Sequence, residues 1–517
     1  MAGLVHDLIY DAAARSPSAA ALAYGEERLD YAALAQTVSN AAAVLLEAGV
    51  EPDERVVVFL EKRIENVAAC FGAAGAGAAF VPVNPLLKPA QVAHIIADCG
   101  AAILVTSPER LHILAAVLAT CPALRTILVA GTAEDVPAVA GKTIESWMRR
   151  ARTRPAHPVS DTAMAAILYT SGSTGLPKGV MLSHRNLVAG AASVASYLEL
   201  GASDRILAVL PLSFDYGFNQ LTSAFYAGAS VVLLNHLFPA DIVKAVADEA
   251  ITGLAAVPPL WIQLARVRWP VPCTLRFITS SGGMMPLATT RALRSALPEI
   301  SLFLMYGLTE AFRSTFLPPC ELERRPGSIG RAVPGAQVMA VRPDGVQCAP
   351  GEAGELVHRG PLVAMGYWND AVRTAERFRP VPGASDIALW SGDTVRCDAD
   401  GFFYFVGRSD DTIKVSGYRV SPSEIEAALH GTGLVVEVVA FGVPHPLLGH
   451  AVVVVAVAGE GVRVAALAAE CRRLLPSYMV PMHIEIAPAP LARNHHGKFD
   501  RAAIRLPFMA LFEGRCA

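Results

Sequence analysis

The first four-fifths of the chain alternates short apolar runs with helical patterns, and this alternation limits the possible folds more than any other feature. Arg55–Leu60 is a strand-like run, a helical pattern follows over Glu65–Ala74, and a second strand-like run spans Ala79–Val83. Apolar strands separated by helices are typical of βαβ units, in which helices cover both faces of a mostly parallel sheet. The sequence therefore predicts an α/β fold, with parallel-sheet αβα lobes in a large N-terminal domain.

The pattern changes after about residue 330. Short strands and turns rich in Gly, Pro and Asp, as in WSGDTVRCDADG, predict a small antiparallel, β-barrel-like region. From about residue 410, strands and helices alternate again, for example at Pro422–Leu429 and Ala451–Ala458, which predicts a small α+β domain. The polar segment Gly407–Asp411 between them has the length and composition of a hinge. We therefore expect an N-terminal domain over residues 1–409 and a mobile C-terminal domain over residues 410–517.

Composition excludes several classes of protein. Of 517 residues, 53% are hydrophobic and 17% charged, which allows a large core and excludes disorder. A net charge of −3 argues against a nucleic-acid partner. Ala451–Ala458 ends at Gly459 and Glu460, so it is too short to cross a bilayer, and no integral membrane association is expected. Nine scattered cysteines and the lack of a basic leader favour the cytoplasm.

The stretch YTSGSTGLPKGV, residues 169–180, follows the apolar run Ala163–Leu168 and has the composition of a phosphate-binding loop. Glycines let backbone N–H groups approach phosphate oxygens, while hydroxyls and a lysine add donors and charge. The pattern differs from Walker A, which places Gly-Lys-Ser/Thr at a helix start. A plain glycine-rich turn is the alternative, which so specific a stretch disfavours. The candidate residues are Thr170, Ser171, Gly172, Ser173, Thr174, Gly175 and Lys178.

YTSGSTGLPKGV resembles the signature loop of the adenylate-forming superfamily, which contains AMP-forming acyl-CoA synthetases, adenylation domains of nonribosomal peptide synthetases and firefly-type luciferases. The resemblance runs nearly end to end, as far as ARNHHGKFDR. SFDYGFNQ, SGYRVSPSEIEAAL and GTGLVVEVVAFGVPHPLLGHAVVVV also resemble acyl-CoA ligases of exosortase-type polysaccharide loci and freestanding aminoacyl ligases that load carrier proteins. The resemblance implies that ATP and Mg²⁺ activate an acid as acyl-AMP, which is then passed to a thiol.

The resemblance also gives roles to motifs that would otherwise be interpreted as turns. In YGLTE, Tyr306 would stack on adenine, and Thr309 and Glu310 would face phosphate and Mg²⁺, for which a carboxylate is a suitable hard ligand. Asp393 and Arg408 would hold the ribose hydroxyls, because a carboxylate accepts from a diol and an arginine donates to it. The implied nucleotide site also includes Gly283 and Gly307.

Three residues near the C-terminus take roles from the resemblance alone. Lys498 would stabilise charge that develops during adenylation, and completes an implied catalytic set with Thr170, Lys178 and Glu310. Asp410 would be the hinge about which the C-terminal domain rotates between adenylation and thiol transfer. Gly417 lies in a loop that would reach the active site for the second step, where a glycine permits close backbone approach.

The acid pocket is indicated by LSFDYGFNQ, residues 212–220. Many acyl-CoA synthetases have a histidine at the position of Phe214, whereas Phe214-Asp215 resembles amino-acid-activating members, in which the aspartate pairs with the substrate ammonium. A buried carboxylate is costly without a cation. Arg313 leaves alternatives open, because it can pair with Asp215 or hold a second acidic group of the substrate. The other expected pocket residues are Tyr216, Asn219, Ser281, Gly282 and Met305.

These features predict an acid–thiol ligase for a small carboxylic acid that carries an amino group. The acceptor would be supplied in trans, either as CoA or as the phosphopantetheine of a carrier protein. The alternative with the same chemistry is an acyl-CoA ligase for a fatty or aromatic acid. A non-catalytic ATP-binding protein is disfavoured, because Glu310, Asp393 and Lys498 are all present.

Overall fold

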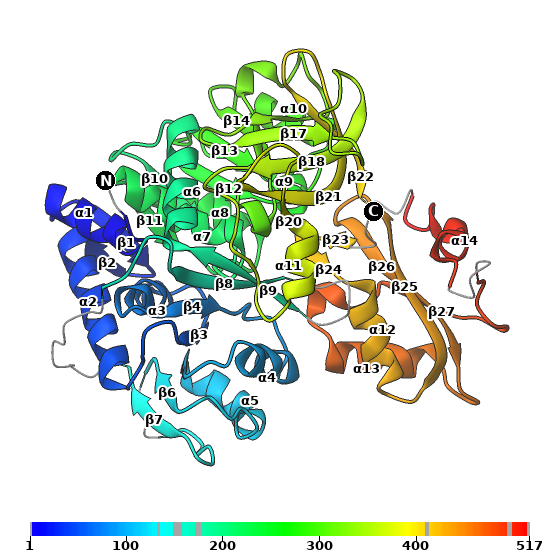
Figure 1. Ribbon diagram of the computed structural model, residues 1–517, viewed down its shortest axis with the longest axis horizontal. Coiled ribbons are helices and arrows are strands. Elements are labelled where there is room, and N and C mark those ends of the chain that lie inside the picture. Colours follow the sequence, from blue (N-terminus) through cyan, green and yellow to red (C-terminus); the bar gives the residue numbers. More distant parts are fainter. Residues whose placement is uncertain are drawn as a thin grey trace.

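The computed structural model describes residues 3–131, 135–147, 158–170, 177–408 and 413–493, and residues 499–513, with only the backbone at Arg408. A large N-terminal body contains two sheets, and a smaller C-terminal unit, orange to red in Figure 1, lies on one side of it. Helices lie against the sheets of the large body, so the predicted α/β fold is confirmed. Within the described ranges, no helix combines the length and apolar content needed to cross a bilayer.

The smaller sheet of the N-terminal body has eight strands, and most of its neighbours pair in parallel, as the alternation predicts. Helices α3 (Ile64–Gly75), α4 (Pro89–Asp98) and α5 (Pro108–Leu118) connect its strands. In spatial order the strands are β19 (Gly366–Tyr367), β9 (Lys178–Ser183), β8 (Met164–Thr170), β4 (Ala79–Pro82), β3 (Arg55–Phe59), β5 (Ile103–Thr106), β6 (Thr126–Val129) and β7 (Thr143–Ser146).

Strands β8 and β9 form an antiparallel hairpin in this sheet, and the sequence predicted to bind phosphate connects them. Thr170 pairs with Lys178 across the hairpin. The two ends of the loop are therefore held side by side, although residues 171–176 lie outside the described part of the chain.

The larger sheet has fourteen strands and joins a parallel half to an antiparallel half. The parallel half and its edge contain β1 (Ala20–Tyr24), β2 (Glu27–Asp30), β10 (Arg205–Ala208), β11 (Ser230–Leu233), β12 (Gly253–Ala256), β13 (Phe277–Ser280) and β14 (Ser301–Tyr306). The antiparallel half contains β15 (Thr315–Leu317), β16 (Ser328–Ala332), β17 (Gln337–Val341), β18 (Ala353–Arg359), β20 (Phe378–Pro380), β21 (Ile387–Cys397) and β22 (Phe403–Arg408). The antiparallel region expected after residue 330 is therefore present, and β16 joins it to the rest of the sheet.

The remaining helices of the N-terminal body cover these sheets. They are α1 (Asp7–Arg15), α2 (Tyr31–Glu47), α6 (His184–Tyr197), α7 (Asp215–Ala227), α8 (Pro239–Asp248), α9 (Pro258–Leu264), α10 (Leu287–Ala296) and α11 (Ala371–Arg377), with the short 3₁₀ helices η1 (Thr309–Ala311) and η2 (Pro319–Glu321). Helix α7 is buried from Asp215 to Phe225, so it has no solvent face. Its Phe218 packs against Phe71 of α3 and Phe80 of β4. Helix α7 therefore connects the cores of both sheets. Its first residue, Asp215, is buried in the protein interior.

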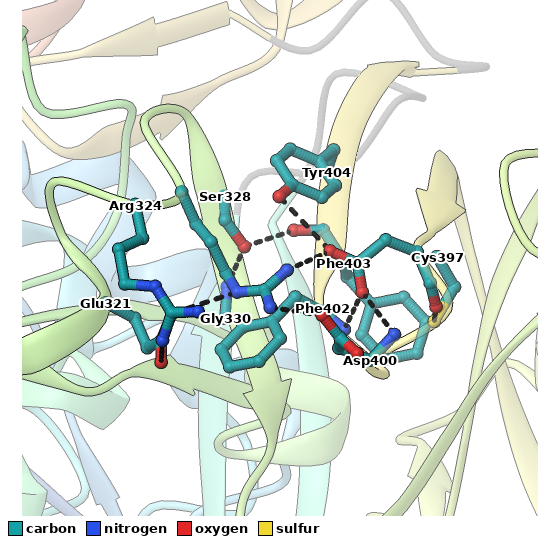
Figure 2. Close-up of polar contacts among 11 residues, drawn as sticks. Glu321, Arg324, Ser328, Gly330, Cys397, Asp400, Phe402, Phe403 and Tyr404 are labelled. Carbon is teal, nitrogen blue, oxygen red and sulfur yellow. Dashed lines mark hydrogen bonds and ion pairs between the residues drawn. The ribbon is translucent and has the colours of Figure 1, made fainter.

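An arginine cluster fixes the turn between β21 and β22 against the segment that precedes β16 (Figure 2). Arg325 donates hydrogen bonds to Glu321, Asp398 and Asp400, and its guanidinium lies 4.1 Å from the centroid of the Phe402 ring. Ser328 also donates to the carbonyl of Phe403, at 2.8 Å. These bonds hold β22 in register, and with it the backbone position of Arg408.

The C-terminal unit is α+β, as predicted, and has its own core. Helices α12 and α13 pack on one face of its five-stranded sheet, and residues from the chain end pack on the other. Its elements are β23 (Ile413–Val415), β24 (Tyr418–Val420), α12 (Pro422–His430), β25 (Val435–His445), β26 (Gly449–Ala458), α13 (Val464–Leu474), η3 (Ser477–Met479), β27 (His483–Ile486), α14 (Arg501–Arg505) and η4 (Leu506–Phe508). The domain boundary at residues 409 and 410 falls outside the described residues and stays a prediction.

Candidate active site

A cavity of about 680 Å³ lies where the C-terminal unit meets the N-terminal body. The body contributes Thr170 from the end of β8, Phe214 and Asp215 from the start of α7, and Thr309 from η1. The C-terminal unit contributes residues 416–419. The fold therefore brings motifs that are far apart in the sequence to the wall of one cavity.

Glu310 and Lys178 form an ion pair beside this cavity, in which Glu310 is buried and Lys178 is half-buried. Lys178 Nζ donates to Glu310 Oε1 at 3.0 Å, and the hydroxyl of Tyr367 on β19 donates to the same oxygen at 2.9 Å. The ammonium also lies 4.2 Å from the centroid of the Tyr367 ring. The structure thus joins two predicted catalytic residues through a tyrosine that the sequence reasoning missed. Tyr367 belongs to no motif, and only the pairing of β19 with β9 brings it near Lys178.

Arg419 on β24 brings a second positive charge to Glu310. Its Nη1 lies 3.6 Å from Glu310 Oε2, across the boundary between the two units. Burial alone would raise the pKa of Glu310, but the charges of Lys178 and Arg419 outweigh it and hold the pKa well below its usual value. Glu310 therefore stays ionised although only 1% of its surface is exposed. Arg419 was missed in the sequence, although it lies two residues after Gly417 in the expected thiol-step loop.

Two threonines face the same cavity. Thr170 and Thr309 both line it, and within the described residues Thr170 Oγ1 is buried without a hydrogen-bond partner. Buried polar atoms nearly always have a partner, so this hydroxyl is suited to a ligand oxygen. Ser171, Gly172, Ser173, Thr174 and Gly175 lie outside the described residues, so their predicted contacts stay predictions.

Tyr306 and Asp393, both predicted to bind the nucleotide, contact each other. Tyr306 ends β14, and its hydroxyl donates to Asp393 Oδ2 on β21. Asp393 also pairs in register with Arg408 on β22, which places the backbones of the two predicted ribose-binding residues side by side. The residues predicted to bind adenine and ribose are thus linked by a hydrogen bond and by strand pairing.

Gly307 has a structural role in the same region. A Cβ at this position would lie 2.8 Å from the Phe312 carbonyl oxygen and 3.0 Å from Arg313 Cα. The backbone must therefore pass close to itself here, which only glycine permits. This close approach sets the position of Arg313.

Asp215 is a buried carboxylate without an ion pair. It is 5% exposed and lies in the cavity wall next to Phe214. Burial raises the pKa of Asp215, while the charge of Arg313 opposes that shift. Among the described residues, no cation lies within 4.0 Å of the carboxylate.

Arg313 contacts Ser281 rather than Asp215. Its Nη1 donates to Ser281 Oγ at 2.9 Å, and its guanidinium lies 4.7 Å from the centroid of the Tyr216 ring. The alternative in which Asp215 and Arg313 form a direct ion pair is therefore not seen in the described part of the chain. Within the described residues, neither Asp215 nor Arg313 has an ion-pair partner.

The other expected pocket residues surround this pair. Met305 accepts a hydrogen bond from Tyr197, the Tyr216 hydroxyl bonds with Thr279, and Asn219 donates to Thr222. Gly282 has φ +87°, and a Cβ there would lie 4.0 Å from both Phe214 Cζ and the Gly417 carbonyl oxygen. Gly283 is exposed and lies near Pro258. The turn of residues 281–283 therefore lies between Phe214 and the loop of Gly417.

Gly417 lies in direct contact with the N-terminal body. It has φ +86°, and a Cβ there would lie 2.6 Å from Val257 Cγ1. The loop of residues 416–419 consequently enters the cavity wall, the position that the resemblance assigns to the thiol-transfer step. Asp410 and Lys498, and the side chain of Arg408, lie outside the described residues.

Another buried carboxylate, Glu424, lies at the contact between the two units. Gln91 of α4 donates to Glu424 Oε1 at 2.8 Å, and Oε2 is buried with no hydrogen-bond partner in the described chain. Burial raises the pKa of Glu424 to about 7. Glu424 lies within SGYRVSPSEIEAAL, but its partner is 333 residues away in the sequence, so no local signal identifies the contact.

Comparisons with known proteins cover both units. A family model described as AMP-binding enzyme matches residues 9–368, and one described as AMP-binding enzyme C-terminal domain matches residues 424–498. Among solved structures, the amide bond synthetase McbA from Marinactinospora thermotolerans superposes with a TM-score of 0.86 at 26% identity, covering 98% of this chain and 99% of that one.

Curated relatives fall into two groups by length. L-proline--[L-prolyl-carrier protein] ligase of Pseudomonas fluorescens is 31% identical over 97% of this chain and 98% of its own length. Feruloyl-CoA synthase of an Amycolatopsis species is 31% identical over 95% of this chain and 96% of its own. A linear gramicidin synthase polypeptide of Brevibacillus parabrevis is 31% identical over 97% of this chain, but the chain spans only 6% of that polypeptide. The similarity therefore extends over single-unit proteins and over a small segment of a much larger one.

Proposed function

The chain belongs to the AMP-binding enzyme family, within the adenylate-forming superfamily, and on this premise we propose that it is an AMP-forming acid–thiol ligase for an amino-bearing acid. In the first step a substrate carboxylate attacks the α-phosphate of ATP, which gives acyl-AMP and pyrophosphate. In the second step a thiol attacks the acyl carbon, which gives a thioester and AMP. The thiol belongs to CoA or to the phosphopantetheine of a carrier protein, and the scattered cysteines favour cytoplasmic action.

The nucleotide side of the cavity supplies the charges that this chemistry needs. Lys178 and Arg419 place two cations around Glu310, where they would neutralise phosphate charge as pyrophosphate leaves. Glu310 Oε2 accepts no hydrogen bond from the described residues and so fits Mg²⁺, which commonly binds one or two carboxylates together with phosphates. When bound, the ion would neutralise charge on the phosphates. Thr170 and Thr309 would donate hydrogen bonds to phosphate oxygens. Lys498 would complete the catalytic set.

The remaining nucleotide contacts are proposed on the same side. We propose that Tyr306 stacks on adenine and that Asp393 and Arg408 hold the ribose. The glycine-rich residues 171–175, with Gly283 and Gly307, complete the site. The Tyr306–Asp393 hydrogen bond supports this assignment, because it holds the aromatic ring and the carboxylate in one fixed arrangement.

Asp215 is the observation that carries the choice of substrate. A buried carboxylate without a cation is unfavourable, and a substrate ammonium supplies that cation. The name of the prolyl-carrier protein ligase describes an amino acid that is loaded on a carrier protein. That ligase matches this chain over nearly its whole length. Both observations support an amino-bearing acid.

The position of the C-terminal unit supports a two-step cycle. We propose that residues 410–517 rotate about Asp410 relative to residues 1–409. In the observed arrangement, Gly417 contacts Val257 and the loop of residues 416–419 lines the cavity, which suits thiol transfer. Adenylation would use the other orientation, in which Lys498 reaches the acyl phosphate. Such a rotation exchanges the residues at one site between two steps.

A second candidate is an acyl-CoA ligase for an aromatic acid. It is favoured by the similarity to feruloyl-CoA synthase over 96% of that enzyme's length. In this case the substrate would bring no cation to Asp215, and the free-energy cost of burying its carboxylate would have to be offset by another interaction.

ATP–pyrophosphate exchange with Mg²⁺ across amino acids, β-amino acids, fatty acids and aryl acids tests the proposal. We expect an amino acid to give the dominant signal. Exchange only with fatty or aryl acids would favour the second candidate instead, and no exchange with any acid would contradict the ligase assignment. Product analysis with CoA and with a phosphopantetheinylated carrier protein then identifies the acceptor.

A further inference from the structure

Arg313 is a buried arginine with an unpaired hydrogen-bonding edge. Arg313 is 1% exposed, and its side chain is among the largest fully buried ones in the described part of the chain. Nη1 donates to Ser281 Oγ, but Nε and Nη2 are buried and have no hydrogen-bond partner among the described residues. Buried guanidinium groups normally have their donors paired, so these two N–H groups indicate a ligand atom.

The edge formed by Nε and Nη2, which is unpaired in Arg313, binds carboxylates in other arginines of this protein. The N–H bonds of Nε and Nη2 lie in the guanidinium plane and point outward along one edge of it. Together they match the two oxygens of a carboxylate. Other arginines use this same pair of nitrogens for a bidentate contact, such as Arg63 with Glu65, Arg185 with Asp161, Arg276 with Asp204, and Arg359 with Asp386. Arg313 is thus prepared for a carboxylate that its own chain does not provide within the described residues.

The surroundings of Arg313 hold the cation without filling that edge. The guanidinium lies 4.7 Å from the Tyr216 ring centroid and 5.3 Å from that of Phe312. Aromatic faces attract a cation but accept no strong hydrogen bond. The same two aromatic residues line small interior cavities of about 30 and 10 Å³, and Asp215 lines the second with Phe312. These cavities have room for about one water molecule, so a substrate side chain that reaches Arg313 beyond Asp215 must enlarge them.

Asp215 and Arg313 are neighbours of opposite charge that do not pair with each other. Tyr216 follows Asp215 on α7, and the Arg313 guanidinium lies over the Tyr216 ring, so α7 brings the carboxylate and the guanidinium to the same region. A single small molecule with an ammonium and a carboxylate at the matching separation would satisfy both. The α-carboxylate cannot serve for Arg313, because it must react with ATP.

We propose that Arg313 binds a second carboxylate of the acid, so that the substrate class is an amino dicarboxylic acid. Its ammonium pairs with Asp215, its distal carboxylate accepts from Nε and Nη2 of Arg313, and its remaining carboxylate is adenylated. Ser281 positions the guanidinium through Nη1. This inference rests on the proposed function, because it concerns the acid that the ligase activates.

The test compares acids that differ only at the distal group. ATP–pyrophosphate exchange is measured with L-aspartate, L-glutamate and L-2-aminoadipate, and with L-asparagine, L-glutamine and L-norleucine as uncharged counterparts. We expect the best dicarboxylate to exceed its counterpart in kcat/KM by about 100-fold or more, because a buried charged donor pair rejects a ligand that cannot accept from it.

Variants of Arg313 locate the source of that preference. Arg313→Met should reduce the preference to near unity, and Arg313→Lys should keep only a small part of it, because lysine lacks the planar fork. Ser281→Ala keeps the charge and removes the positioning hydrogen bond, so it should lower the preference even if the Met variant folds poorly. Arg185→Met, at an exposed arginine that makes the same bidentate contact, is the matched control and should leave the preference unchanged.

Three results would overturn the inference. Equal exchange with glutamate and glutamine, in an enzyme that activates amino acids, would remove it and leave the proposed function in place. An Asp215→Asn/Arg313→Met double variant that is more stable than either single variant and still active would show that the two charges compensate each other. Exchange with no acid at all would remove the proposed function and this inference together.

Discussion

The buried carboxylates on the two sides of the central cavity differ in their partners and in the direction of their pKa shifts. On the proposed nucleotide side, Glu310 is surrounded by Lys178, Tyr367 and Arg419, and its pKa is held below the usual value. On the proposed acid side, Asp215 has no ion-pair partner within the described residues, and burial raises its pKa. Both carboxylates are at most 5% exposed, so solvent access does not explain the difference.

The contrast indicates which part of the site the protein completes by itself. A buried carboxylate that is already paired is fixed before any ligand arrives, which is what a preorganised site for phosphate chemistry requires. A buried carboxylate that lacks a partner gains most from a ligand that brings one. We therefore propose that the Glu310 side serves the reaction in general and that the Asp215 side selects the substrate.

Removing the paired carboxylate should have the largest effect on folding. Glu310→Gln leaves Lys178 and Arg419 buried without their counter-charge, and we expect the free energy of unfolding to fall by about 3–5 kcal/mol. Chemical denaturation at pH 7 measures this. Glu323→Gln, which removes an exposed partner of Arg294, is the control and should change stability by less than about 0.5 kcal/mol. A Glu310 variant as stable as wild type would contradict the contrast.

Glu424 gives an intermediate case, because it has one hydrogen bond and a pKa raised from 4.5 to about 7. In the unfolded chain it loses its proton near pH 4.5, whereas in the folded protein it keeps the proton until about pH 7. Wild type should therefore lose stability relative to Glu424→Gln as pH rises through this window, and the difference should level off at about 3 kcal/mol above pH 7.

Unfolding measured at several pH values tests this expectation. Gln91→Met should enlarge the penalty, because the Gln91 hydrogen bond lowers the pKa of Glu424. Parallel stability profiles for wild type and Glu424→Gln would show that Glu424 ionises equally in both states, and would remove it as an intermediate case.

The unpaired carboxylate should behave in the opposite way to Glu310. Asp215→Asn removes a buried charge, so stability should be retained or increased, while kcat/KM for an amino-bearing acid should fall about 100-fold because the charged contact is lost. Thermal unfolding and pyrophosphate exchange measure the two effects separately. If this variant lost as much stability as Glu310→Gln, the two sides of the cavity would not differ as we describe.

The smallest effect is expected at the contact between the two units. Gly417→Ala would place a methyl 2.6 Å from Val257 Cγ1, so thioester formation should slow by about tenfold while adenylation is nearly unchanged. Val257→Ala in the same chain should restore part of the rate, because it removes the methyl groups in the way. Gly433→Ala is the control, since φ is +70° there but no atom lies within 4 Å of the added Cβ. Equal losses in both half-reactions would contradict a role in the second step alone.

Much of the fold could be predicted from local patterns. The alternation of apolar runs and helices predicted β3, α3 and β4 to within two residues at each end. These elements follow from hydrophobic periodicity, which is a property of neighbouring residues. The residue types of YTSGSTGLPKGV indicated a phosphate-binding loop, whereas the reaction class came from the resemblance of this loop and of YGLTE to the adenylate-forming superfamily.

The contacts that distinguish this protein came from the tertiary structure. Tyr367, Arg419 and Gln91 belong to no catalytic motif, and each acts on a residue far away in the sequence. The sequence also left open whether Asp215 and Arg313 pair. Their separation depends on how Gly307 brings the backbone near Arg313 and on how α7 is buried between two sheets. The sequence by itself determined the elements and the class of chemistry, whereas the state of each buried charge was decided by packing, because electrostatic energy depends on distance in space and on burial.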